Sequence, residues 1–339
     1  MNVFAPWALI SALLACTAVH AEPASPPLGD VSACKQYSGL PPNGGATEQV
    51  WVPGGSFVMG SNTHYPEEGK AREATVDGFW IDRHEVTNAQ FRAFTTATGY
   101  KTLAERGLDP AAYPGLPPAM YRPGSTVFEM PRQLDIANMQ WWRYVEGADW
   151  QHPTGPGSSI VNMDNHPVVQ IAYEDALAYA RWAHRSLPGE AQFEYAAKGG
   201  SSTTYPWGKT LHLNGRDMAN TWTGVFPFQN TAGDGFVATA PVGCFAENAF
   251  HLYDMVGNVW EWVSDDWTPY HSLEEQPHPD VDLEDALATQ ARTTMLGTIK
   301  GGSFLCSPAY CKRYRPSARH AQDRTMGTNH IGFRTVAIP

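Results

Sequence analysis

The chain has 339 residues, of which 42% are hydrophobic and 17% are charged, so it can fill the core of one large domain or two ordinary ones. Its 31 Gly, 27 Pro and 12 Trp are typical of a loop-rich domain with aromatic packing, rather than of a helical bundle or a disordered chain. The formal net charge of -11 argues against nucleic acid as the main partner.

Residues 1–21 are predicted to be an export signal. The apolar run from Leu9 to Ala15 is too short to span a bilayer, and a small-residue cleavage site ends at Ala21. No Lys or Arg precedes this run. An alternative is a lipoprotein box that would leave Cys16 lipidated at the mature N-terminus. Both interpretations place the mature protein outside the cytoplasm, in the periplasm or secreted, and no later segment reads as a transmembrane helix.

Residues 22–47 are rich in Pro, Gly and Ser and are predicted to form a linker or poorly ordered arm, so the folded domain spans 48–339. Two short β-type runs, 50–52 and 56–59, flank a Pro-Gly-Gly turn, which is a hairpin signal, and 79–81 is another β-type run. A capping box at Thr87 begins a helix that Gly99 stops, and further helices are expected around 175–183 and 190–198.

Beyond residue 200, short aromatic and apolar patches alternate with Gly, Asn and Asp. This pattern is typical of irregular loops over a small antiparallel sheet. Residues 268–295 are polar and acidic and are predicted to be a surface excursion. The sequence therefore predicts one α+β domain with little regular secondary structure, small antiparallel sheets and a few helices.

Export would leave four cysteines of the domain and its arm in an oxidising compartment: Cys34, Cys244, Cys306 and Cys311. The simplest account pairs Cys34 with Cys244, and Cys306 with Cys311, as structural bridges, although the sequence leaves the connectivity open. A bridge between Cys306 and Cys311 would close a very small loop, and such a bridge constrains the unfolded chain least. A purely structural role is therefore the weaker interpretation for that pair.

Residues 300–315 are the most informative segment, because they place Cys306 and Cys311 after a Gly-Gly turn and amid Tyr and Arg. Thiols this close in sequence can form a disulfide, act as a redox couple or hold a soft metal ion between two sulfur atoms. Together with the Gly-Phe-Arg run at 332–334, the segment resembles the catalytic segment of formylglycine-generating enzymes. These oxidases use copper and O2 to convert a cysteine of sulfatases into the aldehyde formylglycine.

The resemblance to this family extends from residue 52 to residue 336. Matching blocks follow in the family's order at 53–61, 85–88, 147–150, 166–168, 187–195, 205–208 and 256–262, with Gly189 where Thr is usual. It implies the family's irregular, C-type-lectin-like domain. Related proteins on this fold include silent paralogues and siderophore-maturation proteins, which lack the cysteine pair, so Cys306 and Cys311 are the specific sign of the oxidase.

The resemblance also implies roles for individual residues. Cys306 and Cys311 would bind Cu(I), and Ser303 and Trp260 match active-site positions, although alone they read as a turn residue and a core residue. Three further residues are expected to bind the substrate: Tyr310, Arg319 and His330. His330 stands where the family usually has Asn, so it could donate a similar hydrogen bond, titrate near neutral pH or add a metal ligand.

Two calcium sites are implied in the same way. The first comprises Asn220, Thr221, Asp234 and Phe236, and the second comprises Asp254, Gly257, Val259 and Glu261, with Asp254 where Asn is common. Calcium prefers hard oxygen ligands, which carboxylates, amides and loop carbonyls supply. Without the resemblance, Asp234 and Asp254 would read as turn residues.

The implied partner is an unfolded sulfatase polypeptide carrying Cys-x-Pro-x-Arg, bound by a monomer. Residues 306–310 themselves resemble this motif, but Tyr310 replaces the required Arg, so we reject the interpretation that the chain is itself a sulfatase. Two alternatives stay open: a non-catalytic sulfatase-binding or regulatory paralogue on the same fold, and an oxidase of a different exported protein.

Overall fold

The computed structural model describes residues 1, 28–41, 47–111, 113–131, 140–269, 271 and 296–338. The predicted export signal beyond residue 1, Cys16 and most of the 268–295 excursion lie outside the described residues. Within the described part of the chain, no helix has the length and apolar character needed to cross a membrane.

The helices that the sequence predicted are present. They are α2 (Asn88–Thr98), α4 (Tyr173–Trp182) and α5 (Glu190–Lys198). The structure also contains the short helices α1 (Val31–Gln36) and α3 (Leu103–Arg106) and the 3-10 turns η1 (Pro66–Glu68) and η2 (Pro118–Tyr121). The capping box of α2 forms as predicted, with Thr87 Oγ accepting the Gln90 N–H, and Gly99 ends the helix in the left-handed region at φ 69°.

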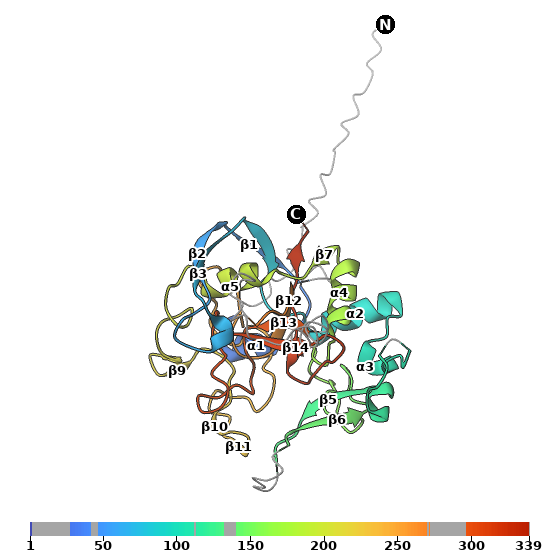
Figure 1. The fold of residues 1–339 in the computed structure, drawn as a ribbon. Coiled ribbons are helices and arrows are strands. Elements are labelled where there is room, and N and C mark those ends of the chain that lie inside the picture. The colour runs from blue at the N-terminus through green and yellow to red at the C-terminus, as the bar shows by residue number, and fades with distance from the viewer. Residues whose placement is uncertain are drawn as a thin grey trace.

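The domain contains two four-stranded sheets, one at the top of the view in Figure 1, beside the C-terminus, and one near its middle. The first has the order β1 (Gln49–Val52), β4 (Phe79–Asp82), β16 (Val336–Ala337) and β7 (Arg185–Ser186). The second has the order β14 (Arg319–Asp323), β13 (Leu296–Lys300), β12 (Trp260–Asp266) and β15 (Ile331–Gly332), in which β15 runs parallel to β12. The α+β prediction is confirmed.

The remaining strands of the described residues form four antiparallel pairs. They are β2 (Gly55–Met59) with β3 (Arg72–Val76), β5 (Gly124–Phe128) with β6 (Trp142–Glu146), β8 (His212–Leu213) with β9 (Arg216–Asp217), and β10 (Gly224–Val225) with β11 (Gln229–Asn230). The predicted hairpin between 50–52 and 56–59 is wrong, because β1 pairs with β4 and β2 pairs with β3. The chain changes sheets at Gly54, where a Cβ would lie 2.8 Å from the Gly78 nitrogen.

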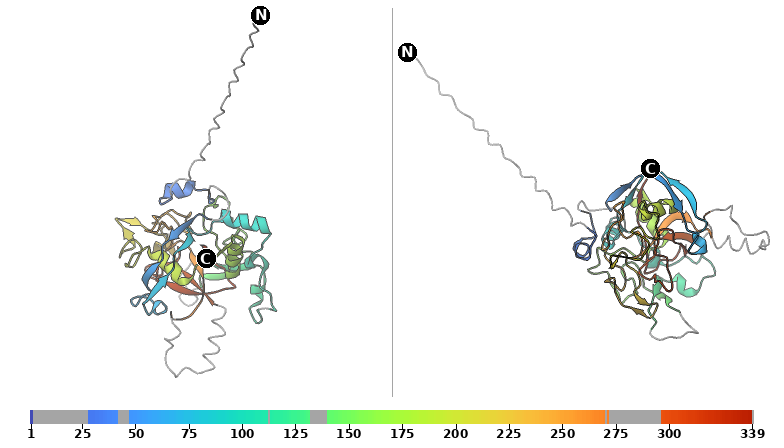
Figure 2. Two further views of the ribbon diagram at one scale, coloured as in Figure 1. Left: turned by 90° about the horizontal axis from the view of Figure 1, so that it is seen from above. Right: turned by 90° about the vertical axis from the view of Figure 1, so that its left-hand side faces the viewer.

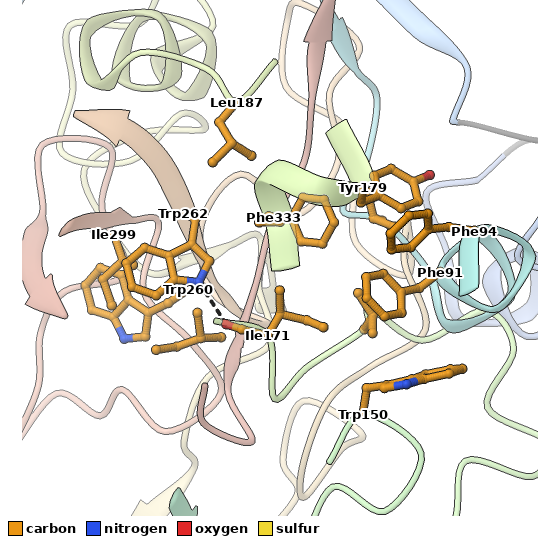
Figure 3. Close-up of a cluster of buried hydrophobic side chains, with 14 of the residues drawn as sticks. Phe91, Phe94, Trp150, Ile171, Tyr179, Leu187, Trp260, Trp262, Ile299 and Phe333 are labelled. Atoms are coloured by element: carbon orange, nitrogen blue, oxygen red, sulfur yellow. Dashed lines mark hydrogen bonds between the residues drawn. The ribbon is translucent and has the colours of Figure 1, made fainter. Parts of the chain in front are cut away.

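An aromatic core lies between α2, α4 and β12 (Figure 3). Phe91 packs against Phe94, Trp150 and Tyr179 with ring centroids 5.3 to 6.0 Å apart. Trp262 donates its indole N–H to the Ile171 carbonyl at 2.9 Å, so even this large side chain is buried without losing a hydrogen bond. Each such side chain contributes about 1.5–3 kcal/mol on burial, which explains how a loop-rich chain holds one shape.

The prediction of a linker or poorly ordered arm does not hold for residues 28–41. Here α1 lies against the periphery of the domain (Figure 2), and Cys34 forms a disulfide with Cys244. The Asn165 side chain donates to the Cys34 carbonyl at 2.8 Å, and Gly29 N–H donates to the Gly243 carbonyl at 2.8 Å. Composition predicted flexibility, but the disulfide and these contacts fix the segment.

Candidate active site

Strand β13 leads directly into the loop that carries Cys306 and Cys311. Two glycines follow the strand with positive φ, and a Cβ on Gly302 would lie 2.6 Å from the Arg313 carbonyl oxygen. This close approach folds the chain back on itself. The Cys306 N–H then donates to the Ser303 carbonyl at 2.9 Å, so the serine and the first thiol belong to one tight turn.

The two thiols face each other without a bond. Their sulfur atoms are 2.8 Å apart, Cys306 is 1% exposed and Cys311 is half-buried. A disulfide has sulfurs about 2.05 Å apart, so the structural bridge considered for this pair is not what the structure contains. The predicted pairing of Cys34 with Cys244 is confirmed.

The surroundings of the two thiols shift their pKa values in opposite directions. Burial raises the pKa of Cys306. The hydrogen bond from the Cys306 thiol, helped by the charge of Arg313, lowers the pKa of Cys311 to about 7. The pair therefore favours one protonated sulfur at Cys306 and one thiolate at Cys311, and the thiolate is the form that attacks electrophiles and binds metals.

A segment far away in sequence, which includes Tyr65 and Glu67, contacts the basic residues that follow Cys311 in this loop. The Arg313 guanidinium lies 3.8 Å from the centre of the Tyr65 ring and donates to Glu67 at 3.1 Å. Tyr65 also accepts the Lys312 N–H at 3.1 Å. Sequence reasoning missed Tyr65 and Glu67, because no local pattern marks two loop residues that contact a segment about 250 positions away.

Hydrogen bonds connect Ser303, His330 and Trp260, three of the residues named from their family positions. Ser303 is fully buried, and its Oγ lies 3.0 Å from His330 Nδ1. The His330 carbonyl accepts the Trp260 N–H at 2.9 Å, and the Trp142 ring packs at 4.9 Å from the His330 ring. Burial lowers the pKa of His330 to about 3, so its imidazole is neutral at physiological pH.

An aromatic platform borders the thiol loop at Tyr310. The Tyr310 ring, 54% exposed, stacks on Phe226 with centroids 4.4 Å apart and meets the edge of Trp141 at 5.4 Å. Phe128 connects Phe226 to Trp142, so the platform consists of Trp141, Trp142, Phe128, Phe226 and Tyr310. Its members come from the β5–β6 and β10–β11 hairpins and the thiol loop, and sequence reasoning found only Tyr310 among them.

Arg319 is not brought to the thiols by any contact in the described residues. It is 1% exposed and makes a two-point ion pair with Glu190 at 2.7 and 2.9 Å. It also donates to the Thr268 carbonyl at 2.6 Å and lies over the Trp267 ring. These contacts favour a structural role for this arginine over the expected role in binding substrate.

At the first expected calcium site, the Asp234 carboxylate contacts the backbone of two other residues of the set. Asp234 accepts N–H groups from Thr221 at 2.8 Å and Phe236 at 3.1 Å, and burial raises its pKa to about 6. Asn220 uses its amide nitrogen on Ala238, whereas its Oδ1 is buried without a partner in the described part of the chain. A buried amide oxygen without a partner and a buried carboxylate are both groups that suit a hard cation.

The second expected site is richer in charge. Asp254 is buried and accepts the Gly243 N–H at 2.5 Å, while Glu261 makes a two-point ion pair with Arg334 at 2.7 Å. Glu85 lies near both acids, and one of its oxygens is buried without a hydrogen-bond partner among the described residues. Asp254, Glu261 and Glu85 thus have one arginine between them, an imbalance that a cation would relieve.

Backbone groups would have to complete both sites. Among the described residues, no group of three or more His, Cys, Asp or Glu side chains is arranged to hold a metal ion. Calcium readily takes carbonyl oxygens, so sites built from Thr221, Phe236, Gly257 and Val259 carbonyls remain compatible with this geometry. Asn258 connects the two regions, because it accepts from Asn220 at 3.0 Å and donates to Glu85 at 3.0 Å.

Comparison with known proteins shows the family of the chain. Residues 38–338 match the family model of the sulfatase-modifying factor enzyme 1-like domain. The chain is 51% identical over 295 residues to the formylglycine-generating enzyme of Mycobacterium tuberculosis (strain ATCC 25618 / H37Rv), covering 86% of this chain and 98% of that protein. It is 41% identical over 296 residues to the formylglycine-generating enzyme of Mus musculus, covering 86% of this chain and 75% of that protein.

The solved structure of PvdO from Pseudomonas aeruginosa is similar in fold. The two share a TM-score of 0.55 and 25% sequence identity, over 86% of this chain and 94% of that one. This similarity supports the fold assignment made from the sequence.

Proposed function

The chain belongs to the sulfatase-modifying factor enzyme 1-like family, and we propose that it uses copper and O2 to oxidise the cysteine of Cys-x-Pro-x-Arg segments in unfolded sulfatases to formylglycine. The observation that carries the proposal is the pair Cys306 and Cys311, two unbonded thiols 2.8 Å apart on one loop. Relatives named formylglycine-generating enzymes, 51% and 41% identical over most of the chain, support the conversion of a sulfatase cysteine to formylglycine.

The chemistry of the thiol pair fits Cu(I). Sulfur is a soft donor, and Cu(I) accepts a low coordination number, so two sulfurs on one loop suit it. Cys311 favours the thiolate that a metal requires, and Cys306 lies directly opposite. Copper, when bound, would supply the reaction with O2, while the protein positions the substrate and limits the access of water.

The platform beside the thiols supports binding of an unfolded segment. Tyr310 directly precedes Cys311 and presents more than half of its surface to solvent together with neighbouring rings. Exposed aromatic faces gather apolar side chains, which an unfolded sulfatase displays and a folded one buries. The segment would therefore lie extended over Phe226 and Tyr310, with its cysteine directed at Cys311.

We also propose that calcium occupies both oxygen-rich sites and that the protein acts outside the cytoplasm. The Asn220 oxygen, which has no hydrogen-bond partner among the described residues, supports the first site, and the excess of acids around Asp254 supports the second. The Cys34–Cys244 disulfide supports export, because disulfides persist in oxidising compartments and are rare in the cytosol.

The test is mass spectrometry of a synthetic Cys-x-Pro-x-Arg peptide incubated aerobically with the protein, with and without Cu(I). We expect copper-dependent conversion of the cysteine to an aldehyde that a hydrazide traps, and no conversion of a matched peptide with Ser in place of Cys. Unchanged peptide, with copper loaded and both thiols reduced, would reject the oxidase. Co-purification of an unmodified sulfatase would then favour a binding module on the same fold.

A further inference from the structure

The hydroxyl of Ser303 is held at two points, in the turn that carries the Cys306 thiol. Its Oγ lies 3.0 Å from His330 Nδ1 and accepts the Leu305 N–H at 3.3 Å. The carbonyl of the same serine accepts the Cys306 N–H. A serine hydroxyl has one proton and two lone pairs, so after the contact with Leu305 it has one proton and one lone pair to exchange.

His330 can pass a proton from one atom to another. It is neutral, because burial lowers its pKa to about 3, and the neighbouring His320 lowers that pKa further. A neutral imidazole has one acceptor nitrogen and one N–H, and the two can exchange. The asparagine usual at this position in the family can share a hydrogen bond but has no such second site for a proton.

We propose that Ser303 and His330 form a proton path that removes the thiol proton of the substrate cysteine as that cysteine binds. The proposal rests on the proposed function, because it requires a substrate thiol beside Cys306 and Cys311. A free cysteine has a pKa of about 8.5, so at neutral pH most of the substrate arrives protonated and its proton must leave.

The transfer balances without any change in oxidation state. The S–H bond of the substrate breaks and its proton joins the Ser303 oxygen, while the Ser303 hydroxyl proton moves to His330 Nδ1. His330, which is only partly buried, releases its Nε2 proton to solvent. The products are a substrate thiolate, an intact serine, the other neutral tautomer of His330 and one proton in solution.

The test compares the pH dependence of kcat/KM for aldehyde formation in the wild-type protein and in His330→Asn. We expect His330→Asn to lower kcat/KM by on the order of 10- to 100-fold at neutral pH. The difference should shrink to a few-fold near pH 9.5, where the substrate is already a thiolate. Ser303→Ala should behave in the same way, and the double variant should be no worse than Ser303→Ala, because both residues serve one path.

His320→Asn is the matched control, because His320 is a nearby histidine whose ring packs against Trp260 and makes no hydrogen bond to Ser303. Burial lowers the pKa of His320 to about 4, so its ring is uncharged at neutral and alkaline pH, and the ratio of this variant to wild type should not change with pH there. A His330→Asn profile parallel to wild type at every pH, or additive losses in the double variant, would overturn the proton path alone. If His330→Asn does not fold, Ser303→Ala decides by the same readout. No aldehyde from the copper-loaded wild type at any pH would overturn the proposed function and this path with it.

Discussion

The two cysteine pairs of the domain differ in separation and in state. Cys34 and Cys244 are 210 positions apart and are joined by a disulfide. Cys306 and Cys311 are five positions apart and stay unbonded, although their sulfurs are 2.8 Å from each other. A cross-link over a long loop constrains the unfolded chain most, and one over a short loop constrains it least. Separation in sequence therefore indicates which pair can serve stability.

The surroundings of the two pairs differ as well: one pair lies among apolar side chains and the other beside a positive charge. Cys34 and Cys244 lie in an apolar cluster that also includes Phe245 and Phe236. Cys311 lies beside the Arg313 guanidinium, and its charge favours the thiolate. Apolar burial keeps sulfur unreactive, whereas a partly exposed, positively charged environment activates it. The comparison assigns stability to the first pair and chemistry to the second.

The largest expected effect comes from changing one pair at a time. Cys306→Ser or Cys311→Ser should reduce aldehyde formation by on the order of a thousandfold or more. The half-buried Cys311→Ser should leave the unfolding free energy nearly unchanged, whereas Cys306→Ser places a hydroxyl in the core and should lower it by about 1–3 kcal/mol. The Cys34→Ala/Cys244→Ala variant should lose about 2–5 kcal/mol of unfolding free energy, with activity retained in its folded fraction. Urea unfolding and the peptide assay measure the two quantities.

A stable but inactive Cys34→Ala/Cys244→Ala variant would contradict this division. So would a Cys311→Ser variant that oxidises the peptide at the wild-type rate. Either result would mean that the state of the sulfurs does not separate the two roles.

Removal of calcium should have a moderate effect that links the first pair to the proposed ion sites. Cys244 follows Gly243, whose N–H is bonded to Asp254, so the disulfide steadies the second site. A calcium chelator should lower the unfolding free energy by about 2–3 kcal/mol if the ion is normally at a hundred times its dissociation constant. The disulfide variant should lose calcium at lower chelator concentration, as measured by metal analysis after dialysis.

Two controls define that result. Magnesium should not restore the stability lost with calcium, because it demands a smaller octahedral site. Asn220→Ala should remove one bound ion and leave the other. An unfolding curve that is unchanged by chelator would contradict both calcium proposals.

Local signals in the sequence predicted local structure. Thr87 and Gly99 fixed both ends of α2, because capping depends on atoms within a few positions. The partner of β1 was missed, since β4 lies about thirty positions later and β16 comes from the end of the chain. No neighbouring residue encodes such pairing, and the Pro-Gly-Gly turn that suggested a hairpin serves instead to change sheets.

The residues of the candidate site also fall into those that a local sequence pattern predicted and those that only the fold brings together. Cys306, Cys311 and Ser303 were found because they share one short segment, and His330 was found because the Gly-Phe-Arg run follows it. Tyr65, Glu67, Trp141 and Phe226 were missed because only the folded chain brings their loops to the thiols. Arg319 matched a pocket position, yet its sequence could not reveal the ion pair with Glu190 that takes up its guanidinium.

The smallest expected effect tests whether charge, rather than sulfur-to-sulfur distance, distinguishes Cys311. In metal-free, reduced protein, alkylation of Cys311 should rise with pH around a midpoint near 7. A nearby positive charge stabilises the thiolate and lowers the pKa, so its removal raises the pKa and moves the alkylation curve to higher pH. Arg313→Gln should therefore shift the midpoint upward by about one unit. Glu67→Gln should shift it less, because it loosens Arg313 without removing its charge.

Lys312→Gln is the control for that measurement, because the contact of Lys312 with Tyr65 runs through its backbone N–H and survives the change. Its midpoint should stay close to that of wild type. An unshifted curve in Arg313→Gln would mean that the Cys306 thiol alone sets the pKa of Cys311. The contrast with Cys34 and Cys244 would then rest on the contact between the Cys306 and Cys311 sulfurs. The contacts of Tyr65 and Glu67 with Arg313 would only fix the conformation of the loop.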